Sequence, residues 1–389
     1  MKKIPFHYSI LIGMVAGAGF GLLFPEQVHW IKPLGVIFIK LLKMLVVPLI
    51  FVSIIHGIDS VGSPQNLSRL GIKTLAYYIG TNILAVTVSM FLVNLVRPGD
   101  GMTVFGEKLT SYDASFNVLD WVPDNIFHAF VNVSTIQIIF IAILFGLAIV
   151  AMRDQVKTIR AGLEEANKLL LKVTTKVIGL APFGVFALIA DMIGSLDFEA
   201  LSGVFKFAIV ILGGLLIHGL ITLPILLKIF SGRPILEFAK QMQPALLAAF
   251  STSSSSATLP ITMECMTEEA KMTDDISGFV LPIGATVNMD GTAMYEAVAC
   301  MFIAQALGVD LSFTQQLVVF FMASVAAMGA ASIPSAGLVT LTMVLSAVGL
   351  PLEGIGFLFA LDRPFDMSRT AVNVWGDMVG CAVIEGKKK

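Results

Sequence analysis

The chain has 389 residues, of which 56% are hydrophobic and 13% are charged, and its formal net charge is −2. Its mean hydropathy of +0.88 exceeds what a soluble domain needs, so the composition predicts an all-α polytopic membrane protein. The small net charge gives no indication of a nucleic-acid partner. Three widely spaced cysteines indicate neither a disulfide framework nor a zinc site.

Eight segments are long enough to be transmembrane helices, because about 20 apolar residues cross the hydrocarbon core of a bilayer. These segments are residues 6–25, 33–58, 74–96, 126–152, 168–193, 203–227, 276–307 and 354–384. The first imitates a signal peptide at its basic start. No clear cleavage site follows it, so we expect it to be retained as a helix.

Two further apolar stretches do not fit simple spans. Residues 241–263 contain STSSSSATLP, and residues 311–352 contain GAASIPSAG. Proline and small residues in mid-segment predict two half-helices joined by a non-helical tip. Such a tip is tolerated at membrane depth only where protein or a water-filled cavity covers it. We therefore expect two re-entrant helical hairpins, hairpin 1 at about 237–268 and hairpin 2 at about 311–349.

The distribution of Lys and Arg predicts that both termini lie in the cytoplasm, because the inner loops then hold most of the basic residues. Each hairpin precedes a helix with a polar interruption, NMDG at 288–291 and the stretch at 366–377. The two hairpins enter from opposite sides. This pattern predicts inverted repeats that meet near the bilayer midplane, as in secondary transporters.

The last span carries a stripe of polar residues, Asp366, Arg369, Thr370, Asn373 and Asp377, at helical spacing. A charge at the bilayer centre costs ~2.5–3.5 kcal/mol on insertion scales, so the stripe predicts a functional site. Arg369 offers a planar fork suited to a carboxylate, and Asp366 suits an ammonium. The alternative is an Asp366–Arg369 ion pair with a structural role only.

Three other groups are candidates. The hydroxyls of Ser253–Ser256, at a half-helix N-terminus, favour a carboxylate, with a serine-rich kink as the equal alternative. Asn288, Asp290 and Gly291 predict an oxygen-rich site for Na⁺, or else a polar cluster between helices. Glu296 could carry a proton if desolvated, or else face a water-filled crevice. Neither GxSxG nor HExxH occurs in the chain, so the sequence does not indicate an enzyme.

With the motifs SSSSATLP, NMDGTAMYEA, SIPSAG and DMSRTAVNVWGD in this order, the chain resembles the dicarboxylate/amino acid:cation symporter family over nearly its whole length. The resemblance implies a secondary active symporter of acidic amino acids, L-aspartate and L-glutamate, driven by Na⁺ and with H⁺ as a further coupling ion. A C4-dicarboxylate:cation symporter and a neutral amino acid:Na⁺ symporter of the same family are the alternatives.

The resemblance also implies roles for single residues. Arg369 and Thr292 match the residues that hold the substrate's side-chain carboxylate, and Glu296 matches a proton-carrying glutamate. The implied substrate-binding set is Ser254, Ser255, Thr292, Ile333, Gly337, Asp366, Arg369, Thr370 and Asn373.

Three Na⁺ sites are implied in the same way. The first comprises Gly284, Asn288, Asn373 and Asp377. The second comprises Tyr78, Thr81, Asn82, Asn288 and Asp290. The third comprises Thr286, Met289 and backbone carbonyls at Ala327, Met328 and Ala330.

The family fold implies a homotrimer in the cell (inner) membrane. Residues 1–61 and 126–195 would form its scaffold and trimerisation domain, and residues 72–98 and 202–389 a transport domain with an elevator-like motion. The accessory arginine of the family is absent at both of its known positions, which Ser253 and Met367 occupy here. Arg363, one turn before Asp366, is the nearest candidate to replace it.

Overall fold

The computed structural model describes residues 6–61, 69–102, 122–132, 134–152, 155–194, 198–328 and 336–387. These residues contain helices and no strand, so the all-α class is confirmed for them. The helices are α1 (Phe6–Leu23), η1 (Pro25–Gln27), α2 (Val28–Val61), α3 (Arg69–Val96), α4 (Ile126–Val131), α5 (Thr135–Ala151), α6 (Lys157–Ile178), α7 (Ala181–Gly194), α8 (Phe198–Ile217), η3 (His218–Thr222), α9 (Leu223–Leu226), η4 (Leu227–Ser231), α10 (Ile235–Thr252), α11 (Ser255–Glu264), η5 (Cys265–Glu269), α12 (Asp274–Val287), α13 (Asp290–Ala306), α14 (Phe313–Met328), α15 (Ala336–Ala347), η6 (Leu352–Gly354) and α16 (Ile355–Glu385).

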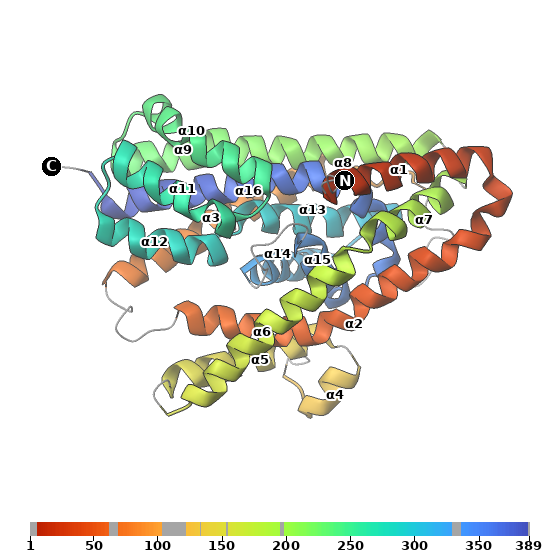
Figure 1. The fold of residues 1–389 in the computed structure, drawn as a ribbon, viewed down its shortest axis with the longest axis horizontal. Coiled ribbons are helices and arrows are strands. Elements are labelled where there is room, and N and C mark those ends of the chain that lie inside the picture. The colour runs from red at the N-terminus through yellow and green to blue at the C-terminus, as the bar shows by residue number, and fades with distance from the viewer. Residues whose placement is uncertain are drawn as a thin grey trace, which may run out of the picture.

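The central helix is α13, which is buried along its whole length from Asp290 to Ala306. It contacts α3, α8, α14, α15 and α16, and α16 in turn contacts α10 and α12. Figure 1 shows α13 and α16 running through the middle of the molecule. A helix that is buried on every side needs no polar face, so the carboxylates on α13 have another reason to be there.

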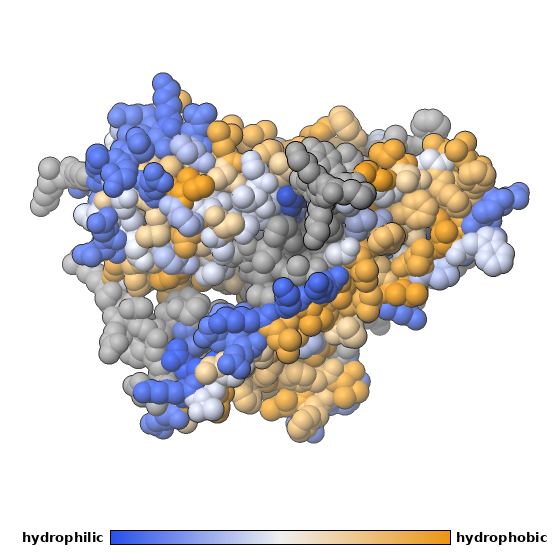
Figure 2. All heavy atoms as spheres, viewed as in Figure 1, coloured by the Kyte–Doolittle hydropathy of each residue, from blue (hydrophilic) through white to orange (hydrophobic). Residues whose placement is uncertain are grey.

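A second group of helices packs beside this centre. Helix α7 lies against α1 and α2, and α2 also contacts α5 and α6. Gly13, Gly17 and Gly21 recur every four residues on α1 and meet the backbone of α7. Small residues at this spacing let two helix backbones approach closely, as they do in membrane helix pairs. Figure 2 shows an apolar surface over α1 and α2 and a hydrophilic one at the end that holds α9–α12.

Both predicted hairpin regions contain two helices in contact. Helices α10 and α11 meet at Ser253, which has a left-handed backbone (φ 51°), and Ser254 caps the start of α11. Helices α14 and α15 also contact each other, and the tip between them lies outside the described residues. The predicted break at NMDG is confirmed, because α12 ends at Val287 and α13 begins at Asp290.

Other boundaries differ from the predicted spans. The expected helix at 126–152 is divided into α4 and α5, and the expected helix at 168–193 is divided at Gly179–Leu180. Two helical stretches among the described residues, Leu70–Val96 and Ser202–Ser231, are long and apolar enough on their own to cross a membrane. The eight-span topology therefore stays a prediction.

The predicted span 203–227 lies within a continuous helix from Phe198 to Ser231, which has π-helical turns at η3 and η4. A π turn leaves backbone groups out of the regular ladder and often marks a functional position. In η3 the carbonyl of Gly219 accepts a hydrogen bond from Trp375 Nε1 on α16 (2.9 Å). The same turn directs His218 at Asp290.

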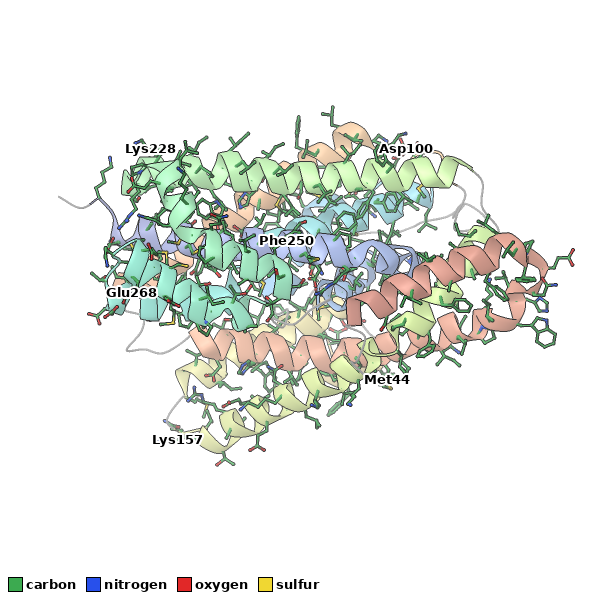
Figure 3. The ribbon with its side chains drawn as sticks, turned by 45° about the horizontal axis from the view of Figure 1, so that its top comes forward. Met44, Asp100, Lys157, Lys228, Phe250 and Glu268 are labelled. Atoms are coloured by element: carbon green, nitrogen blue, oxygen red, sulfur yellow. The ribbon has the colours of Figure 1, made fainter. Side chains whose placement is uncertain are left out.

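Charged residues close both ends of the central group. Figure 3 places Lys228 and Glu268 at one end and Asp100 towards the other. At the Asp100 end, Arg97 binds Asp100 (2.5 Å) and Asp310 (2.6 Å), which joins the end of α3 to the segment before α14. These hydrogen bonds raise the pKa of Arg97 above its ordinary value, and the one to Asp100 has the larger effect.

At the opposite end Arg233 joins three elements. Its guanidinium donates to Glu385 Oε2 on α16 (3.0 Å) and to the carbonyl of Ala270 (2.9 Å). Glu385 also accepts the backbone N–H of Thr273, just before α12 (3.2 Å).

Replacement of Arg233 by Met should lower the thermal stability of the purified protein, because Glu385 would lose its positively charged partner in a largely buried site. We expect a loss of about 1–3 kcal/mol. Thermal melting in detergent measures the change, and Arg233→Lys should keep part of the stability. Equal melting temperatures for the Met variant and the wild type would contradict the role of this contact.

Candidate functional site

Arg369 lies at the centre of the candidate site. It is 1% exposed, and it is the largest of the fully buried side chains among the described residues. Asp366 Oδ1 accepts hydrogen bonds from Arg369 Nε (3.1 Å) and Nη2 (2.8 Å), and Asp362 Oδ1 lies 3.1 Å from Nη2. The Asp366–Arg369 pair that the sequence left open is therefore present, and Asp362 extends it.

Two other helices, α13 and α15, approach Arg369 closely. Its carbon lies 4.4 Å from the centre of the Tyr295 ring, which gives a cation–π contact from α13. A Cβ at Gly337 on α15 would come within 2.8 Å of Arg369 Nη1, and a Cβ at Gly291 would come within 2.7 Å of the Arg369 carbonyl. Arg369 Nη1 is buried and has no hydrogen-bond partner in the described part of the chain. One edge of the fork thus offers a donor to a ligand.

The break before α13 is built into a polar network with α16. Asn288 Nδ2 donates to Asp377 Oδ1 (2.9 Å), and Asn373 Oδ1 accepts the backbone N–H of Gly291 (2.7 Å). Asn373 Nδ2 donates to Thr292 Oγ1 (3.2 Å). The predicted members of the first Na⁺ site therefore lie together, and the Gly284 carbonyl accepts the Asn288 N–H (2.9 Å).

Asp290 is fully buried with His218, whose Nε2 lies 3.1 Å from Asp290 Oδ2. Asp290 Oδ1 and Asn288 Oδ1 are buried acceptors without a hydrogen-bond partner among the described residues. Two unsatisfied acceptor oxygens beside the broken helix fit a hard cation such as Na⁺. The donor chemistry at 288–290 therefore suits a hard cation, and the Na⁺ site stays a prediction beside the alternative of a polar cluster between helices.

The other members of the second predicted site come from α3. Tyr78 donates its hydroxyl to the carbonyl of Val280 (2.9 Å), and Thr81 donates to the carbonyl of Tyr78 (3.2 Å). Asn82 is buried, and its Nδ2 has no partner among the described residues. Helix α3 contacts both α12 and α13, so these residues lie on the helix beside the break.

Glu296 lies six residues beyond Asp290 on α13 and is fully buried. Thr340 on α15 donates its hydroxyl to Glu296 Oε1, while Oε2 has no partner within the described residues. The buried position agrees with the desolvated alternative of the sequence analysis. It also connects Glu296 to the second helix of hairpin 2.

The remaining predicted residues are only partly placed. Ser255 and Thr370 are buried, and Ser254 accepts the Ala257 N–H (3.2 Å). Ile333 and Ala330 lie outside the described residues. For the third Na⁺ site, Met289 and Ala327 are buried, Met328 is half-buried and Thr286 is exposed, so that site stays a prediction.

Sequence reasoning missed Asp362, Tyr295 and His218. Asp362 stands four residues before Asp366 on the same face, so the polar stripe could have been extended by one turn. Tyr295 is adjacent to Glu296 but has no charge to distinguish it from a core aromatic. His218 contacts Asp290 from the π turn η3. A single π turn leaves no hydrophobic periodicity in the sequence by which it could be predicted.

Broken helices, paired helices and buried charges on central helices are the features of a membrane transporter with discontinuous helices. The model of the sodium:dicarboxylate symporter family matches residues 6–387, and the chain belongs to this family. It is similar to the proton/sodium-glutamate symport protein of Geobacillus stearothermophilus, with 32% identity over 99% of this chain and 94% of the relative.

Other relatives have similar identity. The proton/glutamate-aspartate symporter of Bacillus subtilis (strain 168) is 33% identical over 100% of this chain and 96% of its own length. An excitatory amino acid transporter of Caenorhabditis elegans is 32% identical over 97% of this chain and 85% of its own length. The sequence-based family resemblance is thus confirmed, and the chain is a membrane protein of a transporter family.

Replacement of Gly291 by Ala should displace α13 from α16, because the new Cβ would meet the Arg369 backbone. We expect a loss of stability of about 1–3 kcal/mol together with weaker binding of substrate. Melting and radioligand binding in detergent measure the two effects. Gly278→Ala on α12 is a matched control, because a Cβ there meets nothing within 4 Å. If Gly291→Ala left melting and substrate binding unchanged, the packing of α13 on α16 would not depend on the close contact at Gly291.

Proposed function

We propose that the chain is a multi-pass cell-membrane symporter of acidic amino acids, L-aspartate and L-glutamate, driven by Na⁺ and by H⁺. The observation that carries the proposal is the buried guanidinium of Arg369, which keeps one donor without a hydrogen-bond partner among the described residues, beside the carboxylate of Asp366. The printed names of the relatives, glutamate and glutamate-aspartate symporters, support the same substrates.

The chemistry of the two side chains suits an amino acid with a second carboxylate. A guanidinium binds a carboxylate through two parallel donors, and Asp366 suits the substrate ammonium. A C4-dicarboxylate has no ammonium, so it would leave Asp366 without this partner in a dry site. A neutral amino acid would supply no side-chain carboxylate to accept from Arg369 Nη1, the donor that has no partner among the described residues. The pair therefore favours aspartate and glutamate over both alternatives.

Na⁺ is proposed as the coupling ion at the broken helix. Asn288, Asn373, Asp377 and the Gly284 carbonyl would hold one ion, and Asp290 with residues of α3 would hold another. The buried Oδ1 atoms of Asn288 and Asp290, which have no hydrogen-bond partner in the part of the chain that the structure describes, support this assignment. A proton on Glu296 would remove a buried negative charge, and the contact with Thr340 would connect that charge to hairpin 2.

The same proposal includes the membrane arrangement. It comprises eight spans, two re-entrant hairpins, inverted repeats, cytoplasmic termini and a homotrimer in a lipid bilayer. The packing of α2 against α5, α6 and α7, and of α1 against α7, supports a scaffold, which contacts the central helices through α7 on α16 and α2 on α15. The apolar side chains exposed on α1 and α2, such as Val15, Leu22 and Ile37, support contact with lipid or with another subunit.

Uptake of radiolabelled L-aspartate and L-glutamate into proteoliposomes tests the proposal, with the Na⁺ and pH gradients imposed separately. Uptake that follows the Na⁺ gradient, and is blocked by unlabelled aspartate better than by succinate or alanine, is expected. Uptake that follows neither gradient, or that prefers succinate or alanine, would overturn the proposal.

Arg369→Cys should weaken binding of aspartate by about a hundredfold or more, because a buried partner of the substrate carboxylate is lost. Binding of radiolabelled aspartate and of a neutral amino acid, such as serine, checks this result. Retained melting behaviour shows that the variant is folded. Normal aspartate affinity would exclude Arg369 from the substrate site.

Glu296→Gln should leave aspartate binding intact and remove the pH dependence of uptake, because the amide has the same shape and cannot ionise. Uptake between pH 5 and pH 9 at a fixed Na⁺ gradient measures this. This interval extends from about the ordinary carboxyl pKa values to well above the ordinary histidine pKa. If uptake by the Glu296→Gln variant still depended on pH, another group would carry the coupled proton.

A further inference from the structure

His218 is a buried polar side chain beside the broken helix, and the proposed function gives it no role. It lies in the π turn η3, and its Nε2 is 3.1 Å from Asp290 Oδ2. An ionised carboxylate only accepts hydrogen bonds, so this contact requires a hydrogen on Nε2. His218 Nδ1 is buried and has no hydrogen-bond partner among the described residues, which suits the nitrogen of a neutral imidazole that carries no hydrogen.

The two oxygens of the Asp290 carboxylate have different surroundings. Oδ2 faces His218, and a Cβ at Gly376 of α16 would lie 3.8 Å from the same oxygen. Oδ1 is buried without a hydrogen-bond partner in the part of the chain that the structure describes. The hydrogen bond from His218 therefore fixes the rotation of the carboxylate and determines which oxygen stays available to a cation.

Helix α16 holds the π turn in place. The carbonyl of Gly219, the residue after His218, accepts a hydrogen bond from Trp375 Nε1 (2.9 Å). The same helix carries Asn373 and Asp377, which bind the backbone and side chains of the break before α13. The imidazole is thus held against the helix that also supports the break.

We propose that His218 is a positioning residue for the cation site at Asp290. Its imidazole N–H holds Asp290 Oδ2, so that Oδ1 stays available to the ion. The inference rests on the proposed function, because it presupposes that Asp290 and residues of α3 hold Na⁺. The alternative is a hydrogen bond that only joins η3 to α13.

A positioning role and a purely structural role predict different results. Loss of a hydrogen bond that orients a metal ligand commonly lowers metal affinity about 10–100-fold. If His218 positions Asp290, its loss should raise the Na⁺ concentration that is needed to stabilise the protein. If His218 only joins two helices, its loss should lower the melting temperature equally with and without Na⁺.

His218→Leu, His218→Asn and His218→Gln are compared with the wild type in detergent. Glutamine can place its amide donor near the position of the imidazole Nε2, whereas the shorter asparagine reaches only the position of Nδ1. Melting is measured in NaCl against choline chloride, and the Na⁺ concentration at half-maximal stabilisation is the Na⁺ midpoint. It should rise about tenfold or more in the Leu and Asn variants and stay within about threefold of the wild type in the Gln variant.

Gln305→Leu is the structural control, because Gln305 joins α13 to the end of α3 away from the break. Its Nε2 donates to the Val93 carbonyl (3.3 Å), and its Oε1 accepts the Gly99 N–H (3.1 Å). This variant should lower the melting temperature in both salts and leave the Na⁺ midpoint unchanged. If Gln305→Leu moved the midpoint as far as His218→Leu, the midpoint would report general destabilisation, and the positioning role would be overturned.

The dependence on Asp290 is tested by a double-mutant cycle. The shifts of the Na⁺ midpoint in His218→Leu and Asp290→Asn should not add in the double variant, because both changes act on one carboxylate. Additive shifts would overturn the assignment of His218 to Asp290. If the Leu variant does not fold, His218→Asn takes its place in the cycle.

The failure of this inference differs from the failure of the proposed function. An Na⁺ midpoint that His218→Asn leaves unchanged, or that His218→Gln does not preserve, would overturn the positioning role while the wild type still responds to Na⁺. A wild type that Na⁺ does not stabilise would overturn the proposed cation site and the role of His218 with it.

Discussion

The arrangement of the central helices depends on the burial of one guanidinium. Arg369 is 1% exposed, and an unpaired cation in such surroundings is strongly unfavourable. Its own helix supplies Asp362 and Asp366, α13 supplies the face of Tyr295, and α15 approaches through Gly337. These three helices are therefore held around one charge. The same enclosure removes competing water from the donor that the proposed substrate would use.

At the break between α12 and α13, buried backbone groups also need hydrogen-bond partners. Ending α12 at Val287 and starting α13 at Asp290 leaves polar backbone groups inside the protein. Asn373 accepts one of them, the N–H of Gly291, and Asn288 is held by Asp377. An apolar side chain at Asn373 would leave that N–H without its partner. The polar stripe of α16 thus supports both the substrate site and the break beside it.

The sequence predicted the features that depend on polar residues or helix-breaking motifs in apolar segments. The helical spacing of Asp366, Arg369 and Asn373 placed these residues on one face, and the NMDG motif located the break before α13. Other features have no such mark. The division at Gly179–Leu180 lies inside an apolar segment, where hydropathy cannot distinguish one helix from two. The contact of Asp290 with His218 joins residues that are 72 positions apart and depends on a π turn.

The π turn at η3 also limits how this part of the chain can change in length. It accommodates an additional residue within a helix that otherwise continues from α8 to α9. Deleting one residue there would restore a regular helix and rotate its two ends relative to each other by about 100°. Before the turn lies Phe207, whose ring is 4.9 Å from that of Phe302, and inside the turn lies Gly219, whose carbonyl accepts from Trp375 Nε1. Both contacts could not survive that rotation, so single-residue insertions and deletions between positions 207 and 219 should be selected against far more strongly than substitutions.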